Sequence, residues 1–285
     1  MQDGGTIMHI RAGKAFIRQL LSASSRTSSL QELYGLAFEL YAYLALIASP
    51  TPYSNGTESE LDTRSSSLLP SWDMLRDYGV FGVIVSPIHQ FLETIPRVVT
   101  LCTRRQIEMT FDECSSESWA EFISLIGLIE TIGHGDDEDD NDALDPTLNL
   151  EHRQSLSVSA VYRHALAIFT YDAMWCGAIA GDESQLSTVR GHALSALALI
   201  PSLMDTHLRN ILLWPTIVVG SCLLHEEERD VIRLLWSNQG REPVFLLMKM
   251  KTMLESLWAE NDPVFFGPYG LQKHMMSHQT VIYLA

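Results

Sequence analysis

Apolar side chains recur every three or four positions along most of this chain, a spacing that places them on one face of an α-helix. No convincing pair of strands is visible, although residues 280–284 fit either a buried tail or a short strand. The pattern therefore predicts an all-α fold, with roughly eight to ten helices packed in a single array. The predicted helices lie near residues 10–21, 30–47, 86–102, 118–132, 151–180, 182–200, 212–222, 225–236 and 242–258.

Two helix starts carry a recognisable capping pattern. Ser118 followed by Glu121, and Asp182 followed by Gln185, have the spacing of a capping box, in which side chains satisfy the first backbone N–H groups of a helix. We expect helices to begin at both places.

Two prolines fall inside helical patterns. Proline removes one backbone hydrogen bond and its ring crowds the preceding turn, so we expect a bend at Pro96 and another at Pro215. Pro215 stands beside Trp214 in an apolar run that extends from Ile211 to Leu224. That run is too short to span a bilayer, so no transmembrane helix is predicted.

Composition favours a globular protein. The chain has 285 residues, of which 46% are hydrophobic and 19% charged, so it can bury a sizeable core as one helical domain over residues 1–285. The first residues show no basic segment followed by an apolar core, and no signal peptide is predicted.

The formal net charge of −16 argues against nucleic acid as a direct ligand. Binding to phosphates depends on Lys and Arg side chains that displace counterions. The one adjacent basic pair beyond the N-terminal region, Arg104-Arg105, is interpreted as solvated helix surface. We therefore expect no direct contact between this chain and DNA.

The four cysteines do not indicate a metal site. None belongs to a C-x-x-C pair, so the expectation is reduced, partly buried thiols rather than a zinc site. They are Cys102, Cys114, Cys176 and Cys222.

The acidic run Asp136–Asp140 is the sharpest chemical pattern. Asp136, Asp137 and Asp140 match the D-D-x-x-D arrangement with which class I terpene cyclases hold Mg²⁺ and a diphosphate. Nearby glycines interrupt the helix that should present these carboxylates, and no second metal motif follows, since the segment 261–263 lacks its Ser/Thr and Glu. The preferred interpretation is an acidic surface loop over residues 133–149.

Other catalytic patterns fail. The segment His225–Arg229 begins like the zinc-binding H-E-x-x-H helix, but arginine replaces the second histidine, so a charged helix N-terminus is predicted instead. No nucleophile elbow, phosphate-binding loop or dinucleotide-binding turn is present. We predict that the chain is not an enzyme, with no catalytic, cofactor or metal residue.

The tryptophans of the C-terminal half are expected to lie in the core. A small effector pocket lined by some of them remains an alternative, since pockets in helical arrays are apolar with few polar groups. They are Trp175, Trp214, Trp236 and Trp258.

The order of motifs from Leu212 onwards resembles one protein family. Leu213-Trp214-Pro215, Gly220 and Glu228-Arg229 are similar to the "LLWPLFxxGxxA…ER" core of the regulatory region of fungal zinc-cluster transcription factors. Further similar segments are Val80–Gly82, Tyr162–Leu166, Leu194–Pro201, Leu254–Trp258 and Ile282–Ala285.

The resemblance implies a nuclear, all-α region that regulates transcription by RNA polymerase II. Expected partners are other transcription factors or coregulators, a small-molecule effector, or a second copy in a homodimer. The six-cysteine zinc cluster of the family is absent from this sequence, so its DNA-binding role is carried over to no residue here. The alternatives are a Mg²⁺-dependent cyclase acting through Asp136–Asp140, and a cluster-less protein that pairs with a related factor.

Overall fold

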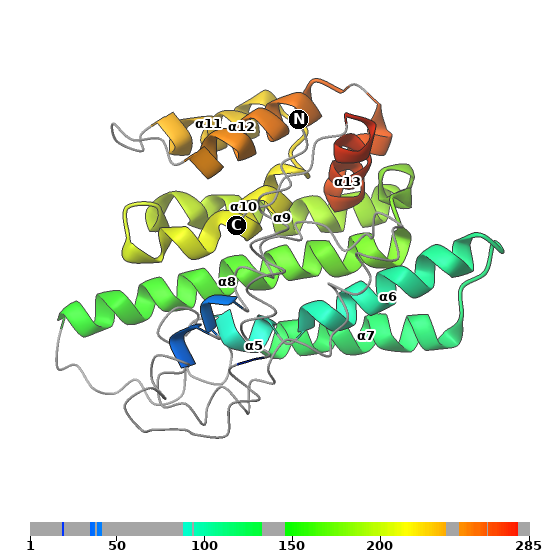
Figure 1. The fold of residues 1–285 in the computed structure, drawn as a ribbon, viewed down its shortest axis with the longest axis horizontal. Helices are drawn as coiled ribbons and strands as arrows, with labels where there is room; N and C mark the ends of the chain where they lie inside the picture. Colours follow the sequence, from blue (N-terminus) through cyan, green and yellow to red (C-terminus); the bar gives the residue numbers. More distant parts are fainter. Residues whose placement is uncertain are drawn as a thin grey trace.

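The computed structural model describes residues 19, 35–37, 39–41, 88–92, 94–132, 146–237, 245–260 and 262–278. Within the ranges from residue 88 onwards it contains nine α-helices and no strand, which confirms the predicted all-α array (Figure 1). The expected helices at 10–21 and 30–47 fall mostly outside the described residues, although 35–37 and 39–41 are helical. The expected tail at 280–284 also lies outside them.

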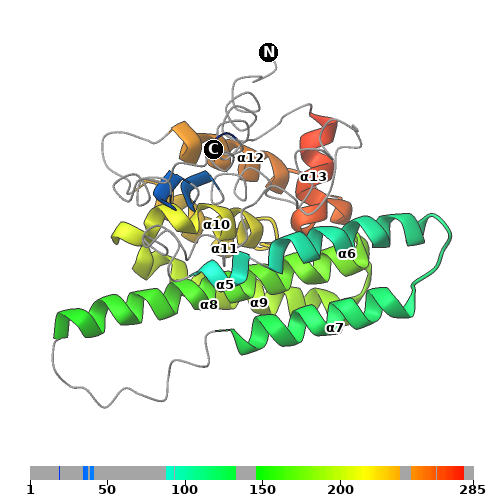
Figure 2. The ribbon, with the colours of Figure 1, turned by 60° about the horizontal axis from the view of Figure 1, so that its bottom comes forward.

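The helices form successive layers on either side of α8, the longest helix (Figures 1 and 2). Helices α6 and α7 pack on one side of α8, whereas α9 and α10 pack on the other. Helices α11 and α12 form an outer layer against α9 and α10, and α13 contacts α8, α10 and α12. The bounds are α5 His89–Leu92, α6 Thr94–Met109, α7 Ser116–Thr131, α8 Pro146–Trp175, α9 Glu183–Leu203, α10 Leu213–Gly220, α11 Glu226–Ser237, α12 Phe245–Trp258 and α13 Gly267–Ser277.

Trp214 lies at the centre of the core. Its side chain is fully buried, stacks on Tyr162 with ring centroids 5.8 Å apart, and meets the edge of Phe169 at 5.4 Å. The Tyr162 hydroxyl donates to the carbonyl of Ile211, so the phenol is buried with its polar atom satisfied. This aromatic cluster packs α8 against the start of α10. Large aromatic side chains contribute most to core burial, so the contact is expected to stabilise the fold strongly.

The capping prediction is confirmed at one helix and wrong at another. The Asp182 side chain accepts from the N–H groups of Ser184 and Gln185, and α9 follows it. Helix α7 instead begins at Ser116, and its N-cap is Ser115, three residues before the predicted cap. The Ser115 side chain accepts from the N–H of Ser118. Ser118 is buried inside the helix, where its hydroxyl donates to Glu108.

Both prolines lie in the first turns of helices rather than in helix interiors. Pro96 is the third residue of α6 and Pro215 the third residue of α10. The first N–H groups of a helix have no intrahelical partner, so proline removes no hydrogen bond there. A separate 3₁₀ helix, His207–Leu212, precedes α10.

Helix α8 begins and ends earlier than predicted. It starts at Pro146, inside the segment assigned to the acidic loop, and stops at Trp175 rather than near residue 180. Cys176 and Gly177 end it with φ of 46° and 85°. A Cβ at Gly177 would lie 2.1 Å from the Tyr269 ring, so glycine is required for both the backbone and the space. Of the described helices, none is long and apolar enough to cross a membrane.

Candidate functional site

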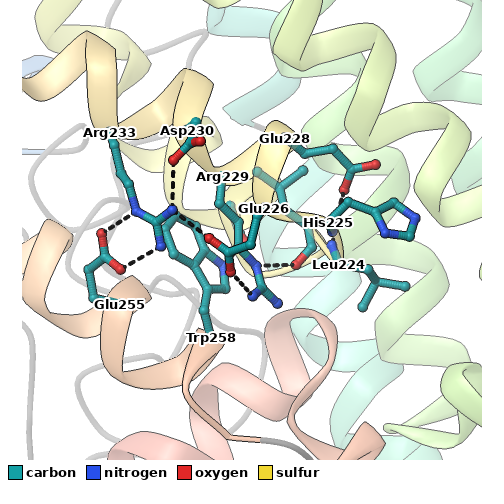
Figure 3. Close-up of polar contacts among 11 residues, drawn as sticks. Leu224, His225, Glu226, Glu228, Arg229, Asp230, Arg233, Glu255 and Trp258 are labelled. Atoms are coloured by element: carbon teal, nitrogen blue, oxygen red, sulfur yellow. Dashed lines mark hydrogen bonds and ion pairs between the residues drawn. The ribbon is translucent and has the colours of Figure 1, made fainter.

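The later part of the motif, Gly220, Glu228-Arg229 and Leu254–Trp258, lies where α11 and α12 meet the end of α10, and Figure 3 shows the charged residues and Trp258 there. We call this the arginine–tryptophan junction, and it consists of Glu226, Glu228, Arg229, Arg233, Glu255 and Trp258 with the backbone of Gly220.

Glu228 organises the start of α11. Its carboxylate accepts from the N–H groups of Leu224 at 3.0 Å and His225 at 3.1 Å, as the third helical residue of a capping box does. The other oxygen accepts from Arg190 of α9 at 2.6 Å. Burial opposes ionisation, but these hydrogen bonds and Arg190 outweigh it and lower the pKa of Glu228. Residues 226–228 thus form the predicted acidic helix N-terminus.

Arg233 is the most heavily paired side chain of the junction. Its guanidinium donates two parallel hydrogen bonds to Glu255 of α12, from Nε to Oε1 at 2.7 Å and from Nη2 to Oε2 at 2.8 Å. Nη1 also donates to Glu226 at 2.7 Å and Asp230 at 2.8 Å. Hydrogen bonding to these carboxylates, Glu255 first, raises the pKa of Arg233, and its bonds lower the pKa of Glu226 and Glu255.

Trp258 lies beneath two guanidinium groups. The guanidinium carbons of Arg229 and Arg233 are 5.5 and 5.3 Å from its ring centroid, within cation–π range. Its ring N–H donates to the carbonyl of Gly220 at 2.9 Å. A Cβ at Gly220 would lie 2.4 Å from Leu254, so glycine lets α10 approach α12 closely.

The arginine–tryptophan junction holds neighbouring helices together, and none of its side chains has a pKa suited to catalysis. Every carboxylate in it accepts from an arginine, and the pKa shifts favour the ionised form of each partner. A general acid or base needs a pKa moved toward the working pH, which is the opposite arrangement. The motif therefore encodes packing between α10, α11 and α12.

A second polar junction joins α6, α7 and α8, and it corrects the interpretation of the basic pair. Arg105 is buried rather than solvated, and it donates to the carbonyl of Met174 at 3.0 Å and to Glu108 at 2.6 Å. Arg104 pairs with Glu117 at 3.1 Å. Periodicity did not reveal this burial, because the partner of the side chain is a carbonyl near the end of α8, 69 residues away in the sequence.

Glu108 is the acceptor at the centre of that junction. It receives the hydroxyls of Ser115 and Ser118, the Ser115 N–H and the Arg105 guanidinium. Burial raises the pKa of Glu108, but the hydrogen bonds outweigh it and lower the value from 4.5 to about 2. The carboxylate is held charged as a structural anchor.

Three of the four cysteines and two of the four C-terminal tryptophans are buried in the core, whereas Trp175 and Trp236 are partly buried and pack against it. No disulfide joins the four cysteines, of which Cys102, Cys176 and Cys222 are buried and Cys114 is exposed. Burial raises the pKa of the Cys222 thiol, which makes it unreactive. Trp214 and Trp258 are buried, and Trp175 packs edge-on against Phe122 at 5.3 Å.

The candidate cyclase residues Asp136, Asp137 and Asp140 lie outside the described residues. Asp262, from the segment considered as a second metal motif, caps the 3₁₀ helix Pro263–Phe265 by accepting from the Val264 N–H at 2.9 Å. A cap is the ordinary role of an Asp before such a turn.

The structure brings histidines together in two clusters that were not predicted from the sequence. His164 and His192 face each other with Nδ1 atoms 3.0 Å apart. His274 and His278 lie beside Glu260, and one ligand atom from each of the three falls within 4.8 Å of the others. The sequence signal for the second cluster is the H-x-x-x-H spacing of a helix face, which was missed because α13 itself was not predicted.

Fold and junction together define an all-helical packing domain held by internally paired charges. The chain belongs to the family of fungal specific transcription factor domains, since the model of that family matches residues 2–268. The match confirms the resemblance and indicates a role in transcription regulation rather than catalysis. It lends no support to the cyclase alternative. No curated protein and no solved structure matches the chain.

Proposed function

We propose that this chain is the regulatory region of a fungal zinc-cluster transcription factor, which controls transcription by RNA polymerase II in the nucleus without contacting DNA itself. The family match over residues 2–268 carries the proposal. Its partners would be other transcription factors or coregulators, a small-molecule effector, or a second copy of the chain. Binding of any of these would act by favouring one arrangement of the helices over another.

The charge distribution supports the absence of DNA contact. Six arginines of the described residues form ion pairs with carboxylates, so the charge of these six side chains is already paired within the chain. The net charge of −16 adds a repulsive field. The six are Arg97, Arg104, Arg105, Arg190, Arg229 and Arg233.

A tethering experiment tests the regulatory role. The chain is fused to an unrelated DNA-binding module in a fungal host, and a reporter gene with sites for that module is measured. We expect reporter transcription to differ from that given by the module alone. The Trp214→Ala variant, which empties the centre of the core, should abolish the difference, because the effect requires the folded array.

The control separates folded regulation from a non-specific effect of acidic sequence. Equal reporter output from the fusion and the Trp214→Ala variant would contradict regulation by the folded domain. A companion mobility-shift assay with the chain alone should show no retarded DNA at physiological salt. A retarded band that weakens steeply with added salt would overturn the absence of DNA contact.

A further inference from the structure

Glu260, His274 and His278 converge where the turn after α12 meets the C-terminal end of α13. The Nδ1 atom of His274 lies 3.4 Å from Oε1 of Glu260, and Nε2 of His278 lies 3.9 Å from the same oxygen. We propose that these three side chains bind one divalent transition-metal ion of the Zn²⁺ type.

The distances suit a shared cation better than a direct hydrogen bond. An N–H···O hydrogen bond spans about 2.7–3.2 Å, shorter than the 3.4 Å between His274 and Glu260. Two ligand atoms that each lie about 2.0–2.2 Å from a tetrahedral zinc are about 3.3–3.5 Å apart. The observed pair already has that separation, and a small rotation of the half-exposed His278 ring would complete the set.

His274 is the buried member of the cluster. Its side chain is 4% exposed, and its Nδ1 has no hydrogen-bond partner among the described residues although it faces Glu260. A buried polar atom without a partner costs free energy, which a metal ion at this position would offset.

The second ring is oriented by its own helix. Nδ1 of His278 lies 3.1 Å from the carbonyl oxygen of His274, which can only accept, and 3.0 Å from the Ser277 hydroxyl, which itself donates to that carbonyl. These contacts favour the tautomer with the proton on Nδ1, which leaves the lone pair on Nε2, the nitrogen that faces Glu260. A backbone carbonyl that fixes the tautomer is the usual support of a metal-binding histidine.

The surroundings favour a cation of intermediate softness. Two imidazoles and one carboxylate suit Zn²⁺, Co²⁺ or Ni²⁺, whereas Mg²⁺ and Ca²⁺ prefer oxygen ligands. The C-terminal end of α13 adds the negative end of a helix dipole. Since the Gly267 N–H at the start of α13 donates to Ser221 at the end of α10, a bound metal would tie α12 to a helix already bonded to α10.

Co²⁺ binding to the full-length chain without an affinity tag tests the site. Titration is followed by calorimetry and by visible absorption, in excess Mg²⁺ to saturate sites made only of carboxylates. We expect one Co²⁺ per chain with the visible bands of a four-coordinate ion. His278→Ala and Glu260→Gln should each weaken binding by at least about tenfold, by analogy with the loss of supporting groups around metal ligands.

The matched control is His152→Ala, which removes an exposed imidazole of α8 and should leave the affinity unchanged. The His278 side chain is half-exposed, so its alanine variant should keep the wild-type circular dichroism spectrum. Three outcomes would overturn the site: no Co²⁺ binding by the wild-type chain, wild-type affinity in both His278→Ala and Glu260→Gln, or an intense near-ultraviolet band that assigns the ion to cysteine thiolates.

Discussion

The ring N–H of Trp258 donates to the carbonyl oxygen of Gly220 at 2.9 Å, although 38 residues separate the two in sequence. Gly220 is the last residue of α10, where carbonyls lack intrahelical partners, so a side chain of α12 satisfies the end of α10. The same tryptophan lies beneath Arg229 and Arg233 of α11. One residue therefore links three helices, and the glycine is what lets them come close enough.

Gly220→Ala should destabilise the protein by about 1–3 kcal/mol. The added Cβ would lie 2.4 Å from the Leu254 side chain and 3.3 Å from the Ile232 side chain, both fully buried, so either these side chains repack or α12 moves away. Urea unfolding followed by circular dichroism measures the change. The matched control is Gly191→Ala in α9, where a Cβ meets no atom within 4 Å. That variant should gain roughly 0.5–1 kcal/mol, because alanine favours a helix interior. Equal effects at the two glycines would contradict the close approach.

The fork between Arg233 and Glu255 should have a measurable coupling energy. A double-mutant cycle with Arg233→Gln and Glu255→Gln is expected to give about 0.5–1 kcal/mol, since the pair is bidentate and partly shielded from water. The same cycle on Arg104 and Glu117 should give a value near zero, because the Glu117 side chain is 77% exposed. Addition of salt should reduce the first coupling less than a fully exposed pair would lose. A coupling no larger than that of the exposed pair would contradict the proposed role of the junction.

Helix existence could be predicted from periodicity, because the core faces of α8, α9 and α11 repeat at helical spacing. Helix boundaries depended on contacts that periodicity does not encode. Ser115 rather than Ser118 caps α7, since the buried Ser118 hydroxyl is bound to Glu108. Helix α13 was missed because its sequence begins with glycine and proline and its buried residues include the polar Gln272 and His274.

The site was predicted only as an ordered set of motifs. The sequence placed Trp-Pro, glycine and Glu-Arg in family order, but the contact of Trp258 with Gly220 is a tertiary one across 38 residues. The burial of Arg105 likewise depends on the carbonyl of Met174 in a distant helix. Long-range pairing of this kind follows from the fold and not from local spacing.

Glu108→Gln should destabilise the protein near neutral pH and make its free energy of unfolding depend less steeply on pH in acid. The folded carboxylate has a pKa of about 2, against 4.5 for the ordinary group. Between these pH values, Glu108 binds more protons in the unfolded chain than in the folded protein. The stabilising effect of the Glu108 carboxylate is therefore fully present above pH 4.5 and is lost as the pH falls toward 2. Unfolding free energies measured across this interval should fall less steeply in the variant, which should also lose about 1–3 kcal/mol at pH 7. An unchanged slope would show that Glu108 is not held charged.

The histidine pair of α8 and α9 should make the protein sensitive to mild acid. His164 and His192 share one hydrogen bond through their Nδ1 atoms, which requires at least one of the two rings to be neutral. Burial, followed by the neighbouring His192, lowers the pKa of His164 from 6.5 to about 4, and burial also lowers that of His192. Between pH 6.5 and pH 4, His164 is protonated in the unfolded chain but neutral in the folded protein. The free energy of unfolding therefore decreases as the pH falls from 6.5 toward 4.

The expected loss across that interval is about 1–3 kcal/mol, since one unit of pKa corresponds to about 1.4 kcal/mol and the two rings titrate as a coupled pair. Urea unfolding at a series of pH values measures it, with imidazole proton resonances reporting the titration of the folded state. In the double variant His164→Gln and His192→Gln, the paired side chains can still form a hydrogen bond but cannot titrate. The free energy of unfolding should therefore change less steeply with pH than in the wild-type protein. A histidine resonance assigned to His164 that titrates at or above pH 6.5 would contradict the burial of the pair, because burial is the main cause that lowers the pKa of His164 below its ordinary value.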